Sequence, residues 1–328
     1  MNGKYVVYVT RRIPEAGLEM VRAACQVHLW EGELPPPKEV ILREVADCEG
    51  LLCLLTDPLD AETIAAGAQL RVISQMAVGV DNVDRKAATA RGIPVGHTPG
   101  VLTEATADMA FALLMAAARR IPEGVEKVRA GQWRTWEPLG LLGADVWGAT
   151  LGIVGLGRIG TAVARRARGF AMRILYYDRV RRPELEAELG VEYAALDELL
   201  AQADFVSLHC PLTPETHHVI DERALGRMKR RAILINTSRG PVVDTAALAR
   251  ALQEGWITAA ALDVTDPEPL PPDHPLASLP NCIVVPHIAS ATVTARNRMA
   301  VMAAENLLAG LRGERLPYCA NPEVYAKG

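Results

Sequence analysis

The sequence predicts an α/β protein with two doubly wound domains, in each of which helices cover both faces of a parallel sheet. Short apolar runs alternate with amphipathic stretches twice along the chain, before residue 100 and after residue 150, and such alternation is typical of parallel sheets. The length of 328 residues also suits two separate cores. We expect residues 1–100 with 292–328 to form the first domain and residues 101–291 the second.

Strands of the first domain are predicted by the apolar runs at residues 4–9, 26–29, 50–55, 71–76 and 93–95. Helices are predicted by the amphipathic stretches at residues 15–24, 38–46, 61–66 and 85–90. Pro99-Gly100 ends this pattern, and a long helix follows for which Thr103 is the expected cap and Glu104 an acid of the first turn. Its body, residues 107–118, is apolar nearly all round. We therefore expect it to be buried on every side, either in a core or, as we favour, in a homodimer interface.

The second alternation predicts six strands, at residues 151–154, 173–177, 204–209, 232–236, 259–263 and 282–285. Helices are expected between them, for example at residues 244–254. The last long helix, at residues 294–311, has no strand after it. We expect it to return the chain to the first domain.

A glycine-rich turn opens the second domain. The apolar run 151–154 leads into Gly155-x-Gly157-x-x-Gly160, and a helix-forming segment follows. Gly155 permits a tight turn, Gly157 lets backbone approach a phosphate, and Gly160 lets helix and strand pack closely. The helix N-terminus offers free N–H groups to a pyrophosphate. With six strands, this predicts a Rossmann domain that binds NAD or NADP.

The choice between NAD and NADP depends on the end of the second strand, at residues 173–177. Asp178 follows directly and can accept both ribose hydroxyls, while it would repel a 2′-phosphate. Arg179, Arg181 and Arg182 come next, and arginine at this place can accommodate that phosphate. We expect NAD, with some tolerance of NADP.

Composition excludes several other classes of function. A net charge of −4 and a pI near 6.0 argue against a nucleic-acid partner. The longest apolar run, residues 109–118, is too short to cross a membrane, and the first residues do not resemble a signal peptide. Six cysteines without a CxxC pair suggest buried thiols in a reducing cytoplasm, with neither disulfides nor a metal site.

Three polar residues follow late strands of the second domain: Arg239, Glu268 and His287. Open parallel sheets bind ligands at the carboxyl ends of their strands. Hydride transfer to a carbonyl leaves negative charge on oxygen, and histidine is a suitable proton donor near neutral pH. A neighbouring carboxylate such as Glu268 favours the imidazolium, and an arginine fork matches a substrate carboxylate. The trio predicts reduction of a 2-oxo acid.

Several motifs together resemble the D-isomer-specific 2-hydroxyacid dehydrogenase family along essentially the whole chain. They are Val78-Gly-Val-Asp-Asn-Val-Asp84, residues 151–160, His209-Cys-Pro-Leu-Thr213, Asn236-Thr-Ser-Arg-Gly-Pro-Val-Val-Asp244, residues 262–269 and residues 286–292. Residues 50–56, 131–138 and 266–271 look most like the glyoxylate and hydroxypyruvate reductase branch. The resemblance implies a flavodoxin-like substrate domain beside the Rossmann domain, and a homodimer built largely by residues 101–150.

The resemblance also implies roles for particular residues. It assigns Arg239 to the substrate carboxylate, Glu268 to the histidine partner and His287 to the acid and base. Backbone N–H groups of Val78 and Gly79 would bind the same carboxylate. Further substrate contacts are implied for Leu55, Ser290 and Trp136, the last reaching in from the neighbouring subunit. Besides the three glycines, Asp178 and Arg179, the residues implied to line the cofactor are Thr106, Leu156, Arg158, Ile159, Pro211, Thr237, Ser238, Asp263, His287 and Ser290.

Two other kinds of function stay open at this point. The chain could be another enzyme on the same scaffold, such as a D-lactate, formate or phosphoglycerate dehydrogenase. No extra basic cluster for a second phosphate is evident, which argues against the last of these. It could also be an NAD-sensing binding protein similar to the corepressors of the family, although Arg239, Glu268 and His287 are all present.

Overall fold

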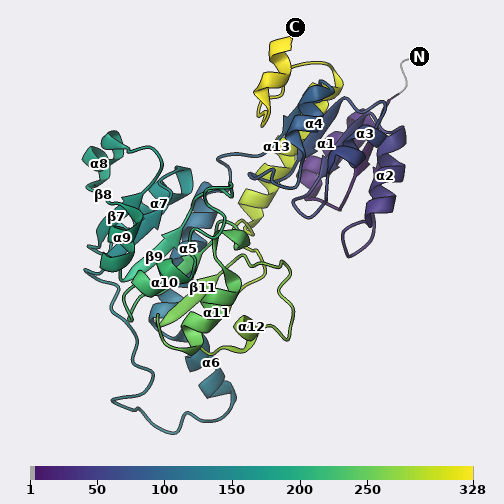
Figure 1. Cartoon of the computed structure of the whole chain (residues 1–328). Helices are drawn as coiled ribbons and strands as arrows, with labels where there is room; N and C mark the ends of the chain where they lie inside the picture. The colour runs from purple at the N-terminus through teal and green to yellow at the C-terminus, as the bar shows by residue number, and fades with distance from the viewer. Residues whose placement is uncertain (1–3, 328) are drawn as a thin grey trace. The chain divides into compact units, whose positions relative to one another are not determined.

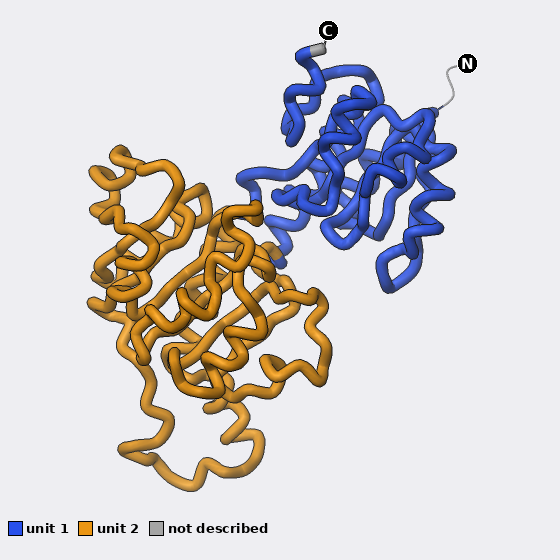
Figure 2. Tube along the Cα trace, in the orientation of Figure 1, with its two compact units in different colours: residues 1–102, 291–328 blue, residues 103–290 orange. Residues whose placement is uncertain are grey.

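The computed structural model describes residues 4–327 and divides into two compact units, residues 1–102 with 291–328 and residues 103–290 (Figure 2). Both are α/β units with a parallel sheet (Figure 1), which confirms the predicted fold class. None of the described helices is long and apolar enough to cross a membrane.

Unit 1 contains a five-stranded parallel sheet in the order β2-β1-β3-β4-β5, the order typical of flavodoxin-like domains. Its strands are β1 (Tyr5–Val9), β2 (Cys25–Leu29), β3 (Gly50–Cys53), β4 (Val72–Gln75) and β5 (Val95–Gly96). Its helices are α1 (Glu15–Ala24), α2 (Lys38–Asp47), α3 (Ala61–Ala66), α4 (Arg85–Ala90), α13 (Val293–Leu311) and the 3-10 helix η2 (Pro322–Lys327). The last long helix, α13, lies in unit 1.

Each face of this sheet is covered because successive strand residues alternate between the two faces. Tyr8, Leu51 and Ile73 pack with Ile41 of α2 in one buried cluster. On the other face α1 lies against α13, and Gly17 permits the approach, since an added Cβ would lie 2.3 Å from a backbone oxygen of α13.

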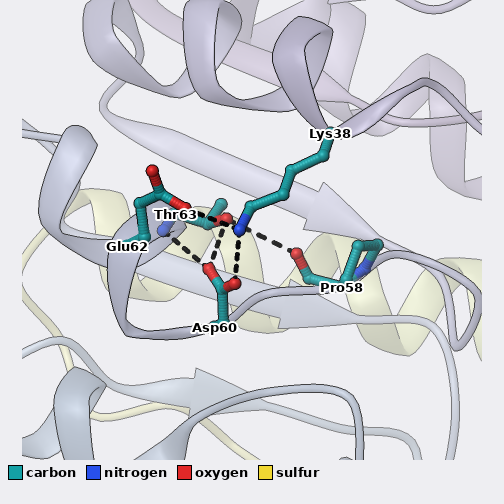
Figure 3. A network of polar contacts seen from close by, with 5 residues as sticks. All are labelled: Lys38, Pro58, Asp60, Glu62 and Thr63. Carbon is teal, nitrogen blue, oxygen red and sulfur yellow. Dashed lines mark hydrogen bonds and ion pairs between the residues drawn. The ribbon is translucent and has the colours of Figure 1, made fainter.

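A polar network joins the starts of α2 and α3 (Figure 3). Lys38 Nζ lies 2.6 Å from a carboxylate oxygen of both Asp60 and Glu62. Asp60 is also the N-cap of α3 and accepts a hydrogen bond from the N–H of Thr63. The hydrogen bond from Lys38, followed by those from Thr63, lowers the pKa of Asp60 to about 2. The network fixes the turn after β3.

Unit 2 contains a seven-stranded parallel sheet in the order β12-β11-β10-β9-β6-β7-β8. Its strands are β6 (Thr150–Val154), β7 (Arg173–Tyr177), β8 (Glu192–Tyr193), β9 (Phe205–Leu208), β10 (Ile233–Asn236), β11 (Ala259–Leu262) and β12 (Cys282–Val284). Its helices are α5 (Thr103–Ala118), α6 (Ile121–Arg129), α7 (Arg158–Arg168), α8 (Pro183–Leu189), α9 (Leu196–Gln202), α10 (Glu222–Arg227), the 3-10 helix η1 (Gly240–Val242), α11 (Thr245–Gln253) and α12 (Pro275–Ser278). The order of strands reverses between β6 and β9, and this is where a doubly wound sheet binds its ligand.

Two details of unit 2 differ from the predictions. The sheet has seven strands rather than six. The prediction lacked β8 because this strand consists of two exposed residues without an apolar pattern. The long helix α5 begins at Thr103 itself and is not buried on every side within this chain, since Asp108 and Ala112 are exposed. Asp108 pairs with Arg166 of α7 at 2.6 Å, so one edge of the apolar helix faces solvent and a charged neighbour.

Candidate active site

The three predicted polar residues follow adjacent strands of the unit 2 sheet: Arg239 after β10, Glu268 after β11 and His287 after β12. The structure brings two of them into direct contact, with His287 Nδ1 2.6 Å from Glu268 Oε1. Burial alone would raise the pKa of Glu268. The hydrogen bond and the charge of His287 outweigh it, aided by the charge of Arg239, and the net pKa is lowered. Glu268 is therefore a carboxylate at neutral pH.

The backbone at His287 is held in the left-handed region, with a φ of 51°, which non-glycine residues rarely adopt. Asp263, only 1% exposed, anchors this turn. Its carbonyl accepts a hydrogen bond from His287 N–H at 2.9 Å, and its carboxylate accepts from the N–H groups of Ile288 at 2.7 Å and Ala289 at 2.9 Å. Burial raises the pKa of Asp263 in spite of these hydrogen bonds. Asp263 thus supports the turn that carries the imidazole.

Arg239 lies on a turn that packs against the segment of Glu268. Asn236 shapes the turn, accepting a hydrogen bond from Ser238 N–H at 3.0 Å and donating one to Arg239 O at 2.9 Å. An added Cβ at Gly240 would lie 1.8 Å from Thr265 O. Only glycine therefore lets the two loops approach so closely.

The glycine turn has the geometry of an anion site. Gly155 has a φ of +96° and lies against the backbone of His209 and Cys210, where an added Cβ would meet a backbone nitrogen at 2.6 Å. A Cβ at Gly157 would meet nothing within 4 Å, so space is open in front of α7. Arg158 and Ile159 form the first turn of α7, whose leading N–H groups lack partners within the helix.

Asp178 follows β7, and its carboxylate accepts a hydrogen bond from Leu156 N–H at 2.9 Å. Arg179 is exposed. Arg181 is engaged by Glu186, with two N···O distances of 2.8 Å. The hydrogen bonds from Arg181 and then Tyr176 lower the pKa of Glu186 to about 2.

Two buried polar atoms directly after β9 and β10 have no hydrogen-bond partner among residues 4–327: His209 Nδ1 and Thr237 Oγ1. His209 follows β9, and its Nε2 forms a hydrogen bond with Ser207 Oγ at 2.8 Å. Burial lowers the pKa of His209 to about 3. The sequence predicted no role for His209, although this residue begins the family motif at residues 209–213. Together with the open glycine turn, these atoms fit a bound dinucleotide.

The remaining predicted residues are placed as follows. Thr106 is buried on α5, Ser238 donates its hydroxyl to Asn236 Oδ1, and Pro211 is exposed after β9. Leu55, 37% exposed, and the pair Val78 and Gly79 lie on loops that follow β3 and β4 of unit 1. Trp136, 79% exposed, lies in residues 130–149, which form neither helix nor strand. Ser290 is the last residue of unit 2.

Comparison with known proteins identifies the class. The family described as D-isomer specific 2-hydroxyacid dehydrogenase, NAD binding domain, matches residues 111–289. The chain belongs to this family, as its motifs predicted. It is 59% identical over 319 residues to a glyoxylate reductase of Korarchaeum cryptofilum, and the match covers 97% of this chain and 96% of the relative.

Two solved structures have folds similar to that of this chain. A protein from Thermus thermophilus is 51% identical, with a TM-score of 0.91 over 96% of this chain and 99% of the other. An NADPH-dependent glyoxylate/hydroxypyruvate reductase from Sinorhizobium meliloti, in complex with NADP and malonate, is 32% identical, with a TM-score of 0.85 over 98% of both chains.

Proposed function

We propose that the protein reduces a small 2-oxo acid with NADH, either glyoxylate to the achiral 2-hydroxy acid or hydroxypyruvate to the D-2-hydroxy acid. The observation that carries this proposal is the contact of 2.6 Å between His287 and Glu268, at the sheet edge that also carries Arg239 and within the unit that contains the glycine turn. The names of the relatives above support the substrate class.

The side chains divide the chemistry between them. The reduced nicotinamide, when bound, supplies the hydride. His287 as imidazolium donates a proton to the carbonyl oxygen of the substrate, and the carboxylate of Glu268 stabilises that charged form. Arg239 binds the substrate carboxylate through its guanidinium. Val78 and Gly79 contribute backbone N–H groups to the same carboxylate, Leu55 and Trp136 shape the space around the small substituent, and Ser290 lies beside it.

NADH is the proposed cofactor, because Asp178 presents a carboxylate where NADPH would carry its 2′-phosphate. Arg181 is engaged by Glu186, and Arg182 lies 3.9 Å from Glu184. Arg179, which is exposed and follows Asp178 directly, is then the arginine left to favour a phosphate. We therefore expect NADPH to be accepted weakly. Steady-state kcat/KM with each reduced cofactor tests this, and a clear preference for NADPH would show that the arginines prevail over Asp178.

We also propose a homodimer formed through the region after α5. Large apolar side chains are unusually exposed between residues 121 and 147: Ile121, Val125, Val128, Trp133, Trp136, Leu139, Leu142 and Trp147. Many large exposed apolar side chains within one segment are characteristic of a subunit interface. Free cysteines throughout the chain are consistent with the proposed cytoplasmic location.

A substrate panel is the decisive experiment. We expect the highest kcat/KM with glyoxylate or hydroxypyruvate, and lower values with pyruvate, phosphohydroxypyruvate and, in the oxidative direction, formate. Preference for pyruvate or phosphohydroxypyruvate would indicate another dehydrogenase of the family. Binding of NADH without turnover of any substrate would indicate a sensing protein instead of an enzyme.

A further inference from the structure

We propose that Gln75 and Asn82 are positioning residues that hold the loop of Val78, Gly79 and Val80, so that the backbone N–H groups of this loop face the carboxylate of the substrate. This inference rests on the proposed function, because it concerns how the same substrate is bound. All the contacts that carry it lie within unit 1.

The carbonyl groups of the loop are held one after another. Ala77 O accepts from the N–H of Thr98 at 2.8 Å, Val78 O accepts from His97 Nδ1 at 3.0 Å, and Gly79 O accepts from Gln75 Nε2 at 2.6 Å. In a trans peptide the C=O and N–H groups point in opposite directions. Each of these carbonyls points toward the residue that holds it. The N–H group of the same peptide, which belongs to the next residue in the chain, therefore points away from that residue.

The N–H groups that this arrangement turns outward belong to Val78, Gly79 and Val80. Within the described part of unit 1, none of the three donates a hydrogen bond. The three residues are half-buried, and partly buried N–H groups without a protein acceptor are available to an anion. The loop is thus prepared to receive a carboxylate before any ligand binds.

Gln75 is unusual because it is a fully buried amide at the end of a strand. Both hydrogens of Nε2 are used, one on Gly79 O and one on Asn82 Oδ1 at 2.7 Å. Its Oε1 accepts from Cys53 Sγ at 3.5 Å. A buried amide destabilises a core unless it forms hydrogen bonds. Both donors of Gln75 bind residues of the loop, so this side chain supports the loop rather than the sheet.

Asn82 connects this loop to the one that carries Leu55. Its Nδ2 donates to Leu54 O at 3.1 Å and to Asp57 O at 2.7 Å. Asp57 in turn accepts from Leu54 N–H at 2.7 Å, and its side chain is fully buried. The anion-binding loop and the loop that shapes the substrate pocket are therefore held as one rigid element by a pair of amides.

The test uses Gln75→Met, which removes both donors at nearly constant volume, and Asn82→Ala as a second variant in case the first does not fold. Asn321→Leu is the matched control: it also removes a fully buried amide of unit 1, one that bonds to Val95, Thr89 and Ile93 rather than to the loop. For each protein we would measure KM for glyoxylate, kcat, the Kd of NADH and the Kd of oxalate for the enzyme–NADH complex.

We expect Gln75→Met to raise the KM for glyoxylate and the Kd of oxalate about tenfold, as for the loss of one anion-binding hydrogen bond. Asn82→Ala should raise both about threefold, and the Kd of NADH should not change in either. Asn321→Leu should lower Tm while leaving KM and the oxalate Kd unchanged. The inference is overturned if the variants that fold keep the wild-type oxalate Kd, or if the control raises it equally. Absence of reduction of both glyoxylate and hydroxypyruvate by the wild type would instead refute the proposed function.

Discussion

Replacing Glu268 with glutamine separates the charge of this side chain from its shape. The variant keeps an oxygen that can accept from His287 Nδ1, which lies 2.6 Å from the carboxylate in the native protein. Because the net pKa of Glu268 is lowered by His287 in spite of burial, the native side chain is charged at neutral pH. The substitution thus removes one negative charge from beside the proposed proton donor.

The expected magnitude follows from the hydrogen bond. Bonds to charged groups contribute about 1.5 to 3 kcal/mol, and neutral ones about 0.5 to 1.5 kcal/mol. The side chains of His287 and Glu268 are 26% and 35% exposed, so solvent weakens the pair. We therefore assign to the lost charge only the difference between a charged and a neutral hydrogen bond, about 1 to 1.5 kcal/mol. That difference corresponds to roughly a tenfold change in rate.

The sign is fixed by the direction of the Glu268 pKa. A lowered carboxyl pKa means that the interaction is present at neutral pH and is lost only as pH falls through that pKa. Proton donation requires the charged imidazolium, which the carboxylate of Glu268 stabilises. Glu268→Gln should therefore lower kcat/KM for glyoxylate about tenfold at neutral pH, and this loss should shrink only as pH falls through the lowered pKa of Glu268.

The assay is initial-rate NADH oxidation with glyoxylate from about pH 5 to about pH 9, with Glu254→Gln as the control. Glu254 lies at the end of α11, and its carboxylate accepts a hydrogen bond from Trp256 Nε1. Because α11 leads from the end of β10 to the start of β11, Glu254 lies at the sheet edge opposite to the one that carries the trio. A native kcat/KM in the Glu268 variant at neutral pH, or an equal loss in the Glu254 control, would refute the electrostatic role of Glu268.

Three further predictions concern the active-site trio, the cofactor and the core. His287→Ala should lower kcat about 10²- to 10⁴-fold with a nearly native Kd for NADH, whereas Arg239→Ala should raise KM and lower kcat together; native turnover in the histidine variant would contradict its acid role. Asp178→Ser should increase the NADPH to NADH ratio of kcat/KM about 10- to 100-fold by removing charge repulsion, and an unchanged ratio would mean that Asp178 does not select the cofactor. Gly17→Ala should lower the free energy of unfolding by about 1 to 3 kcal/mol by forcing α1 from α13, while Gly226→Ala, which has open space around it, should not; equal denaturation midpoints would exclude the steric argument.

Most of the architecture could be predicted because buried parallel strands are short apolar runs. The five strands of unit 1 lie within about two residues of the expected ranges. Strand β8 could not be found this way, since Glu192 and Tyr193 are both exposed and two residues define no period. The prediction that α5 is buried on every side was wrong for the opposite reason. Ala112 is apolar and yet exposed, and composition alone does not reveal which apolar face of a helix lacks a neighbour.

The site was predictable only as far as strand ends determine it. Arg239, Glu268 and His287 follow adjacent parallel strands, so their meeting at one edge follows from the topology. The supporting hydrogen bonds have no such signature. Gln75 stands in the apolar run 71–76 beside Ser74, and a polar pair in a buried strand was the one available signal that something there needed a partner.

The support of His287 explains why the charge of Glu268 can be tested without moving the ring. A non-glycine residue at a φ of 51° persists only if its surroundings determine its conformation. Asp263 provides that constraint, with its carbonyl on His287 N–H and both carboxylate oxygens on the two N–H groups that follow. Glu268 contacts the ring but none of these backbone groups in the turn. One acid therefore fixes the position of the ring and the other supplies a charge beside it. Glu268→Gln should lower kcat/KM with the ring in place, while Asp263→Asn, which converts one accepting oxygen into a donor, should lower kcat by displacing the turn that carries the ring.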